Sequence, residues 1–176
     1  HTVCTPSRCA MMTGWYPHVS GHRTLWHLLR PHEPNLYKYL KQAGYTIRWH
    51  GKNDLYSPEY MEEVVDYWDG ARGGHMGPNP YAPEETPFFS FLYEPFPGDL
   101  HQVQDMQNVQ NGIDFLRSWQ PDDPPFFLYY PLSMPHPPYG APEPYHSMYD
   151  PEAVGELRPA DLESKPDFHE WIRRYR

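Results

Sequence analysis

The sequence has few cysteines, few basic residues and no long apolar run, and each shortage excludes a class of protein. Two cysteines among 176 residues exclude a disulfide-stapled scaffold. Fourteen Lys and Arg against 23 Asp and Glu give a formal net charge of −9, whereas non-specific nucleic-acid binding needs a basic surface. No apolar run approaches the ~18 residues of a membrane span, so no transmembrane helix is expected.

Proline and aromatic residues are abundant instead. The 23 prolines are about 13% of the chain, against a usual ~5%. Phe, Trp and Tyr make up 16%, which is too much for a disordered chain. We therefore expect a folded domain with long, rigid, irregular loops. The sequence opens on His1 without an initiator Met or signal peptide and stops at Arg176 in an apparent helix. We expect an internal fragment, whose localisation stays open.

Periodicity and capping residues predict several helices. Ser57-Pro58-Glu59 can open a short helical stretch, because Ser is a favoured N-cap and Pro suits the first helical position. Helical spacing bounded by capping residues or glycines predicts three more helices, over 6–13 with Thr5 as its cap, over 34–43, and from Asp99 as its cap to Trp119.

Two further segments have the patterns of strands. Residues 45–50 alternate at period two, and 126–130 form a continuous apolar run typical of a buried parallel strand. Residues 70–98 are rich in Gly and Pro and predict an extended loop, with 88–93 as a candidate strand within it. The alternation of helices and strands favours an α/β fold with a mostly parallel sheet.

The first motif that predicts chemistry is Cys4-Thr5-Pro6-Ser7-Arg8, followed by Thr13-Gly14. It resembles the signature of the type I sulfatase family, Cys/Ser-x-Pro-Ser/Ala-Arg with a Thr-Gly a few residues later. The resemblance implies that a formylglycine-generating enzyme oxidises Cys4 to formylglycine. In the family, the hydrated aldehyde of this residue is the nucleophile, and the residue is also a ligand of the metal.

The physical setting of this motif suits an anionic substrate. Cys4 lies just before a predicted helix N-terminus, which offers free N–H groups and a partial positive charge. Arg8 lies one turn further on, and its permanently charged guanidinium can hold the diol oxygen and a neighbouring anion. Lone cysteines are usually buried thiols or disulfide partners, but the surrounding motif argues against that reading for Cys4.

The second motif is His50-Gly51-Lys52-Asn53-Asp54, directly after the strand predicted over 45–50. It resembles the Gly-Lys-x-His segment of the family, whose Lys contacts the substrate sulfate and whose His contacts the formylglycine. Lys52 matches the Lys, whereas Asp54 replaces the His. An ionised Asp54 cannot donate a hydrogen bond, so it either accepts one from the diol or fixes Lys52.

The third motif is Pro135-His136-Pro137-Pro138, shortly after the apolar run at 126–130. It resembles the strand and Pro-His-x-Pro segment of the family, in which the His donates to the sulfate or to its leaving-group oxygen. A protonated imidazole of His136 can bind an anion and act as a general acid. Parallel sheets bind ligands beyond the carboxyl ends of their strands, where Lys52 and His136 are both expected.

The resemblance extends from residue 1 to about 150, and it implies an alkaline-phosphatase-like sandwich. We expect residues 1–176 to be a single, partial sulfatase catalytic domain. The family binds Ca²⁺, or Mg²⁺, through acidic segments that this chain does not contain, so only Cys4, as formylglycine, carries over as a ligand. Because a hard cation needs several oxygen ligands, we expect the isolated chain to be weakly active or inactive.

The predicted function is hydrolysis of a sulfate ester, with Cys4, Arg8, Lys52 and His136 as catalytic residues and Lys52, His136 and Asp54 as substrate-binding residues. The partner is a sulfated small molecule or carbohydrate. Two alternatives stay open. One is a formylglycine-dependent phosphonate monoester or phosphodiester hydrolase, and the other is a non-catalytic binding module on the same scaffold.

Overall fold

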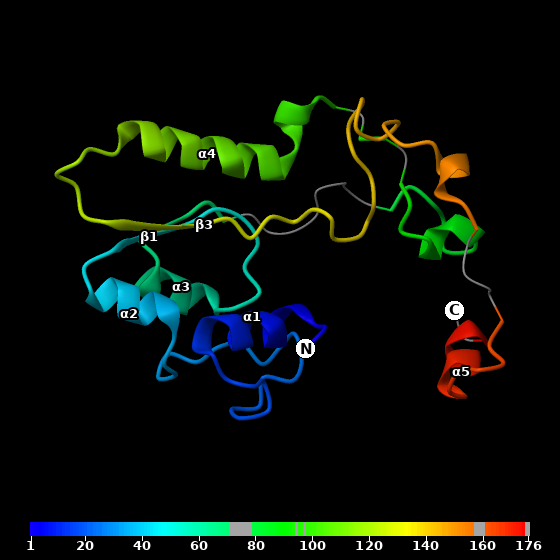
Figure 1. Ribbon diagram of the computed structural model, residues 1–176, viewed down its shortest axis with the longest axis horizontal. Coiled ribbons are helices and arrows are strands. Elements are labelled where there is room, and N and C mark those ends of the chain that lie inside the picture. Colours follow the sequence, from blue (N-terminus) through cyan, green and yellow to red (C-terminus); the bar gives the residue numbers. More distant parts are fainter. Residues whose placement is uncertain (71–78, 94, 97, 157–160, 175–176) are drawn as a thin grey trace. The chain divides into compact units, whose positions relative to one another are not determined.

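The computed structural model describes residues 1–70, 79–93, 95–96, 98–156 and 161–174 (Figure 1). The chain divides into two compact units, which are described separately below. The first unit comprises His1–His75 and His101–Pro135, and the second comprises Met76–Leu100 and His136–Arg176.

The first unit is built around a parallel three-stranded sheet in the order β2-β1-β3. Its strands are β1 (Thr46–Trp49), β2 (Tyr67–Trp68) and β3 (Phe126–Tyr129). Both neighbours run parallel to β1, and the register pairs Arg48 with Tyr67 on β2 and with Leu128 on β3. This confirms the predicted α/β class with a parallel sheet flanked by helices.

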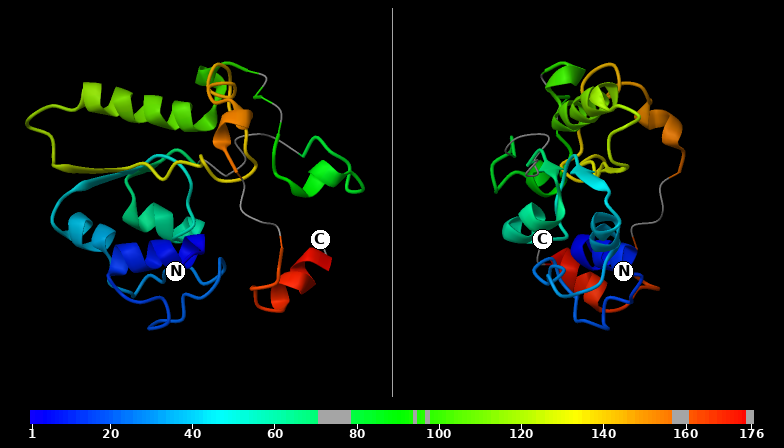
Figure 2. Two further views of the ribbon diagram at one scale, coloured as in Figure 1. Left: turned by 45° about the vertical axis from the view of Figure 1, so that its right-hand side comes forward. Right: turned by 90° about the vertical axis from the view of Figure 1, so that its left-hand side faces the viewer.

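Helices cover both faces of this sheet. One face is covered by α1 (Cys4–Thr13), α2 (Leu36–Gln42) and α3 (Pro58–Val64), and the other by α4 (Gln104–Ser118), as Figure 1 and the left view of Figure 2 show. None of the described helices combines the length and apolarity needed to cross a membrane.

The alternation of β1 side chains explains the two layers. Ile47 and Trp49 are fully buried and face α2, where the ring of Tyr37 packs 5.3 Å from that of Trp49. Arg48 points to the opposite side, where its guanidinium lies 4.2 Å from the ring of Phe115 on α4. The period-two pattern of the sequence thus places an aromatic core on one face and a cation–π contact on the other.

Two of the predicted helices are present, but their first residues and their N-caps differ from the prediction. Helix α1 begins at Cys4 rather than residue 6, and its N-cap is Val3, because the Thr5 hydroxyl donates instead to the Leu25 carbonyl. The predicted cap Asp99 precedes a 3₁₀ turn, Leu100–Gln102, and α4 starts only after Val103. The polar residues expected to cap these two helices are therefore not their N-caps.

The second unit contains short elements. Its 3₁₀ helices are Thr86–Phe89 and Pro151–Val154, and its α-helix is α5 (Phe168–Arg174). The strand predicted over 88–93 is wrong: Pro87 favours the first turn of the 3₁₀ helix, and only an isolated parallel bridge joins Leu92 to Tyr139. The rest of the predicted 70–98 loop is irregular wherever the structure describes it.

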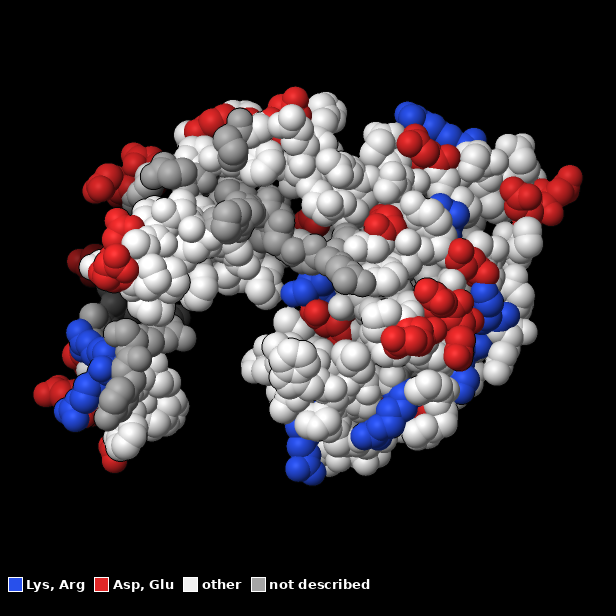
Figure 3. Space-filling model, turned by 180° about the vertical axis from the view of Figure 1, so that it is seen from behind, with Lys and Arg blue, Asp and Glu red and all other residues white. Residues whose placement is uncertain are grey.

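The charges of the molecule are mixed on its surface. On the face shown in Figure 3, Lys and Arg side chains lie beside Asp and Glu side chains. Lys41 and Asp66 form one such ion pair in the first unit. The formal charge of −9 therefore leaves room for a local cationic site.

Candidate active site

Helix α1 and the loop after β1 bring three charged residues together in the first unit. The Asp54 carboxylate lies 3.2 Å from Lys52 Nζ and 3.8 Å from Arg8 Nε, measured to the same Oδ2 atom. All three side chains are about four-fifths buried, with exposed fractions of 19 to 22%. The structure thus brings together three of the five residues singled out from the sequence, and Asp54 fixes Lys52 by an ion pair.

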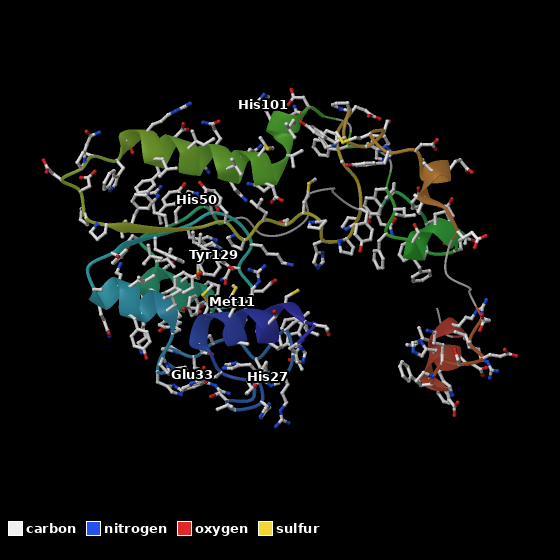
Figure 4. The ribbon with its side chains drawn as sticks, in the orientation of Figure 1. Met11, His27, Glu33, His50, His101 and Tyr129 are labelled. Atoms are coloured by element: carbon white, nitrogen blue, oxygen red, sulfur yellow. The ribbon has the colours of Figure 1, made fainter. Side chains whose placement is uncertain are left out.

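Tyr129, at the end of β3, holds the guanidinium of Arg8 from a second side. Arg8 Nη1 donates to Tyr129 Oη at 3.1 Å, across 121 positions of sequence. Burial raises the pKa of Tyr129, against the opposing effect of Arg8, so the phenol stays neutral. Figure 4 shows Tyr129 on the side of the sheet that faces α1. Sequence reasoning missed this residue, because a Tyr in an apolar run is usually a core residue.

The two cysteines lie in different environments. Cys4 is partly exposed and lines a surface pocket of about 280 Å³ together with Ser7, Arg8 and Met11. Cys9 is 1% exposed in the aromatic core, where burial, followed by nearby Glu33, raises its pKa to about 12. Only Cys4 therefore has both access to solvent and a cationic neighbour.

Lys52 is held by its backbone as well as by Asp54. The Lys52 N–H donates to the Pro131 carbonyl at 2.8 Å, which joins the loop after β1 to the loop after β3. The preceding Gly51 has φ +128°, and a Cβ at that position would lie 2.6 Å from the Pro131 oxygen. Glycine is required here because of both its conformation and the close approach of the second backbone.

His50 and Asp69 support this turn from the interior. Asp69, just after β2, accepts the His50 Nδ1–H at 2.9 Å and the Gly51 N–H at 3.0 Å with its two oxygens. His50 is fully buried on the α4 side of the sheet (Figure 4). Burial lowers the pKa of His50, whereas the Asp69 hydrogen bond opposes that shift. A neutral His50 thus positions the backbone before Lys52.

Asp105, near the start of α4, holds the backbone of the loop after β3, as Asp69 holds the turn after β1. Its two oxygens accept the backbone N–H groups of Ser133 and Met134 at 2.9 and 2.8 Å. Asp105 is 5% exposed, and a carboxylate in the first turn of a helix is also favoured by the helix dipole. The only sequence signal for this role was an acidic residue among the first residues of a predicted helix.

His136 belongs to the second unit and directly follows Pro135, the last residue of the first unit. Its Nδ1 donates to the Pro137 carbonyl at 2.6 Å, which fixes the imidazole on its own loop. Cys4, Arg8, Lys52 and Asp54 all belong to the first unit. The joint action of His136 with them stays a prediction.

The described residues do not by themselves fit a calcium site. Across the described ranges, no group of three or more His, Cys, Asp or Glu side chains could hold a metal ion. Asp54, the acidic member of the cluster, is paired with two cations.

Comparison with known proteins shows the family of the chain. A family model for sulfatases matches residues 1–156. An ulvan-active sulfatase of Formosa agariphila is 29% identical over 163 residues, covering 86% of this chain and 30% of the relative. The human N-acetylgalactosamine-6-sulfatase is 29% identical over 171 residues, covering 81% of this chain and 32% of the relative.

A solved structure is similar as well. The phosphonate monoester hydrolase of Agrobacterium radiobacter superposes with a TM-score of 0.66 at 21% identity, covering 90% of this chain and 37% of that one. This likeness supports the alkaline-phosphatase-like fold that the sequence motifs implied. The chain spans about a third of the length of these relatives. Since the family model matches most of its residues, the chain belongs to the sulfatase family.

Proposed function

We propose that these residues are part of a catalytic domain that hydrolyses sulfate esters, with Cys4 as the precursor of a formylglycine nucleophile. The observation that supports this most is the position of Cys4 at a pocket shared with Arg8, whose guanidinium is tied to Lys52 through Asp54. A sulfate ester needs a nucleophile in line with sulfur and positive donors around its oxygens. Both units are proposed to belong to this one partial domain.

The formylglycine made from Cys4 would supply a hydrated aldehyde, and one of its oxygens attacks sulfur and displaces the alcohol. The second hydroxyl then loses its proton, and re-formation of the aldehyde C=O bond breaks the C–O bond to sulfate and releases it. Arg8 is held between Tyr129 and Asp54, so its guanidinium is pre-oriented beside position 4. Lys52, held by Asp54 and by Pro131, binds an oxygen of the sulfate. His136 gives a proton to the leaving alcohol oxygen.

The proposed partners follow from the relatives and from the motif. Several relatives are named N-acetylgalactosamine-6-sulfatase, and N-acetylgalactosamine is a sugar, so a sulfated carbohydrate is the proposed substrate class. A formylglycine-generating enzyme is the proposed modifying partner. The Ca²⁺ or Mg²⁺ that the family resemblance implies would need several oxygen ligands in addition to a formylglycine at position 4.

Mass spectrometry of the tryptic peptide that ends at Arg8 tests the nucleophile. The protein is isolated from a host that contains the formylglycine-generating enzyme, and an aldehyde in place of the Cys4 thiol is the expected result. An intact thiol in that host contradicts the proposed mechanism. The Cys9 peptide is the internal control, because this buried thiol is not the cysteine that opens the motif and should stay unmodified.

A second candidate reaction is hydrolysis of phosphonate monoesters or phosphodiesters. The solved structure to which this chain is similar is a phosphonate monoester hydrolase. Sulfate monoesters and phosphodiesters share tetrahedral shape and a single negative charge. Rates with an aryl sulfate and an aryl phosphodiester, measured side by side, distinguish the two reactions: a higher kcat/KM for the diester favours the second candidate.

A further inference from the structure

The loop that carries His136 is bound to a second segment of its own unit, residues 91–93. Tyr139, three positions after His136, donates its N–H to the Phe91 carbonyl at 2.6 Å and accepts the Tyr93 N–H at 2.9 Å with its own carbonyl. The same contact forms the parallel bridge between Leu92 and Tyr139. Both segments belong to the second unit, so Phe91 and the His136 loop are held together.

Phe91 has a backbone conformation that phenylalanine rarely adopts. Its φ is +57°, and it is the one non-glycine residue with a positive φ among those that the structure describes. In this left-handed region the Cβ crowds its own backbone, so the conformation costs free energy that Gly or Asn would largely avoid. The ring is 44% exposed, so burial in the core does not offset that cost. Residues strained in this way gather at sites that bind ligands.

Tyr139 adds a second exposed aromatic side chain next to Phe91 along the paired backbones. It is 48% exposed, and a tyrosine offers both an apolar ring and a hydroxyl. Phe89, by comparison, is equally exposed but lies in a regular 3₁₀ helix, and its ring packs against Phe88 at 4.9 Å. Position beside the His136 loop therefore distinguishes Phe91 and Tyr139, and exposure alone does not.

The chemistry proposed for His136 indicates what these rings contact. Its Nδ1 is engaged by the Pro137 carbonyl, so the proton for the leaving alcohol oxygen comes from Nε2. The carbon of the alcohol is one bond beyond that oxygen. The organic part of the sulfate ester therefore lies against the His136 loop, on the unit that also contains Phe91.

We propose that Phe91 and Tyr139 form a subsite for a sugar ring, the alcohol part of the sulfate ester. A pyranose has faces of C–H groups that pack on an aromatic ring while its hydroxyls stay in water, and binding sites are commonly lined by such rings. The strained backbone of Phe91 presents its ring to the sugar and does not bury it in the core. This inference rests on the proposed function, in which His136 gives a proton to the leaving oxygen.

Sugar binding tests the proposal without any turnover. The protein is prepared with 4-fluorophenylalanine at position 91 and, separately, at position 89, and fluorine NMR follows a titration with N-acetylgalactosamine. A saturable shift of the resonance at position 91, with none at position 89, is the expected result. Glycerol, which has hydroxyls but no ring, should leave both resonances in place. No saturable shift at position 91, or equal shifts at both positions, overturns the proposal.

Substitutions separate ligand binding from packing. Phe91→Asn removes the ring and suits the left-handed backbone, so the affinity for N-acetylgalactosamine should fall about tenfold while Tm stays constant or rises by about 2 °C. Phe91→Tyr keeps the ring and should keep the affinity within about twofold. Phe89→Ala is the matched control and should leave the affinity unchanged. An unchanged affinity in Phe91→Asn, a lower Tm in that variant, or an equal loss of affinity in Phe89→Ala overturns the proposal.

Sugar binding and formation of the nucleophile are measured independently, so the two proposals fail separately. The fluorine titration also stands if Phe91→Asn does not fold, because it retains an aromatic ring at position 91. An intact Cys4 thiol together with sugar binding at position 91 overturns the proposed function alone. Formylglycine at position 4 without sugar binding at position 91 overturns the subsite alone.

Discussion

Arg8 is a residue whose position depends on partners from two other parts of the chain. Tyr129 accepts from one of its terminal nitrogens, and Asp54 lies against its Nε. A guanidinium without such partners would sample several rotamers, and ordering it during the reaction would cost free energy. Tyr129 should therefore affect catalysis without contacting the substrate.

Tyr129→Phe tests this role of Tyr129, because it removes only the hydroxyl oxygen that accepts the hydrogen bond from Arg8. The ring keeps its contact with Trp49, at 4.8 Å, while the hydrogen bond to Arg8 is lost. We expect kcat/KM on an aryl sulfate to fall about tenfold and the free energy of unfolding to fall by about 1 kcal/mol. Tyr130→Phe, the same change on the other face of the sheet, is the control. Equal activity losses in both variants would show that Tyr129 acts only through packing.

The two thiols should differ in reactivity when the formylglycine is not formed. At about pH 8, partly exposed Cys4 reacts with iodoacetamide, whereas Cys9 is buried and its pKa of about 12 leaves almost no thiolate. Raising the pH toward 12 increases the thiolate fraction of Cys9. Peptide mass spectrometry after timed labelling measures both rates. Equal rates at the lower pH would contradict the buried position of Cys9.

At the scale of elements, the parallel sheet acts as the frame of the site. The loops after β1 and β3 meet through the hydrogen bond between Lys52 and Pro131, and Asp69 after β2 holds the turn at Gly51. Each strand end therefore contributes to the position of Lys52. Parallel strands bring their carboxyl ends to one edge, which explains why residues distant in sequence support one side chain.

Gly51→Ala should disrupt the contact between the loops after β1 and β3. The added Cβ would lie 2.6 Å from the Pro131 oxygen, and φ is +128°. We expect a loss of about 3 kcal/mol in the free energy of unfolding, measured with urea, together with a raised KM. Gly14→Ala is the matched control: φ is +72° and nothing lies within 4 Å, so about 1 kcal/mol is expected. A smaller loss in Gly51→Ala than in Gly14→Ala would contradict this account.

At the scale of the whole molecule, the chain matches only about a third of the length of its relatives. It spans 30% of the ulvan-active sulfatase and 37% of the phosphonate monoester hydrolase. The described residues contain no group of three metal-ligating side chains. The described residues therefore do not by themselves build the metal site that the family resemblance implies.

The isolated 176 residues should therefore show little or no sulfatase activity, even with Cys4 converted to formylglycine and with Ca²⁺ added. The measurement compares this chain with a full-length relative of the sulfatase family on an aryl sulfate, with circular dichroism to establish that each is folded. Robust Ca²⁺-dependent turnover by the folded chain would contradict the prediction.

Sequence patterns were sufficient for the parts that depend on local chemistry. Periodicity over 45–50 and 126–130 predicted two parallel strands, and the motif around Cys4 predicted the family that the family model then showed. The candidate strand at 88–93 failed, because a local apolar run does not reveal whether a neighbouring strand is available to pair with it. A Pro at its start favoured a 3₁₀ turn instead.

The sequence by itself determined the fold class, the family and the residue types available for binding an anion, because these follow from periodicity and from one contiguous motif. Only the tertiary structure decided what Asp54, Tyr129 and Asp69 do. The partners of Tyr129 and Asp69 lie 121 and 18 positions away along the chain, and a carboxylate or phenol acquires its role from the charges and donors that folding places around it. The pairing of Asp54 with two cations is the clearest case, since position 54 alone predicted two different roles and the distances favour one.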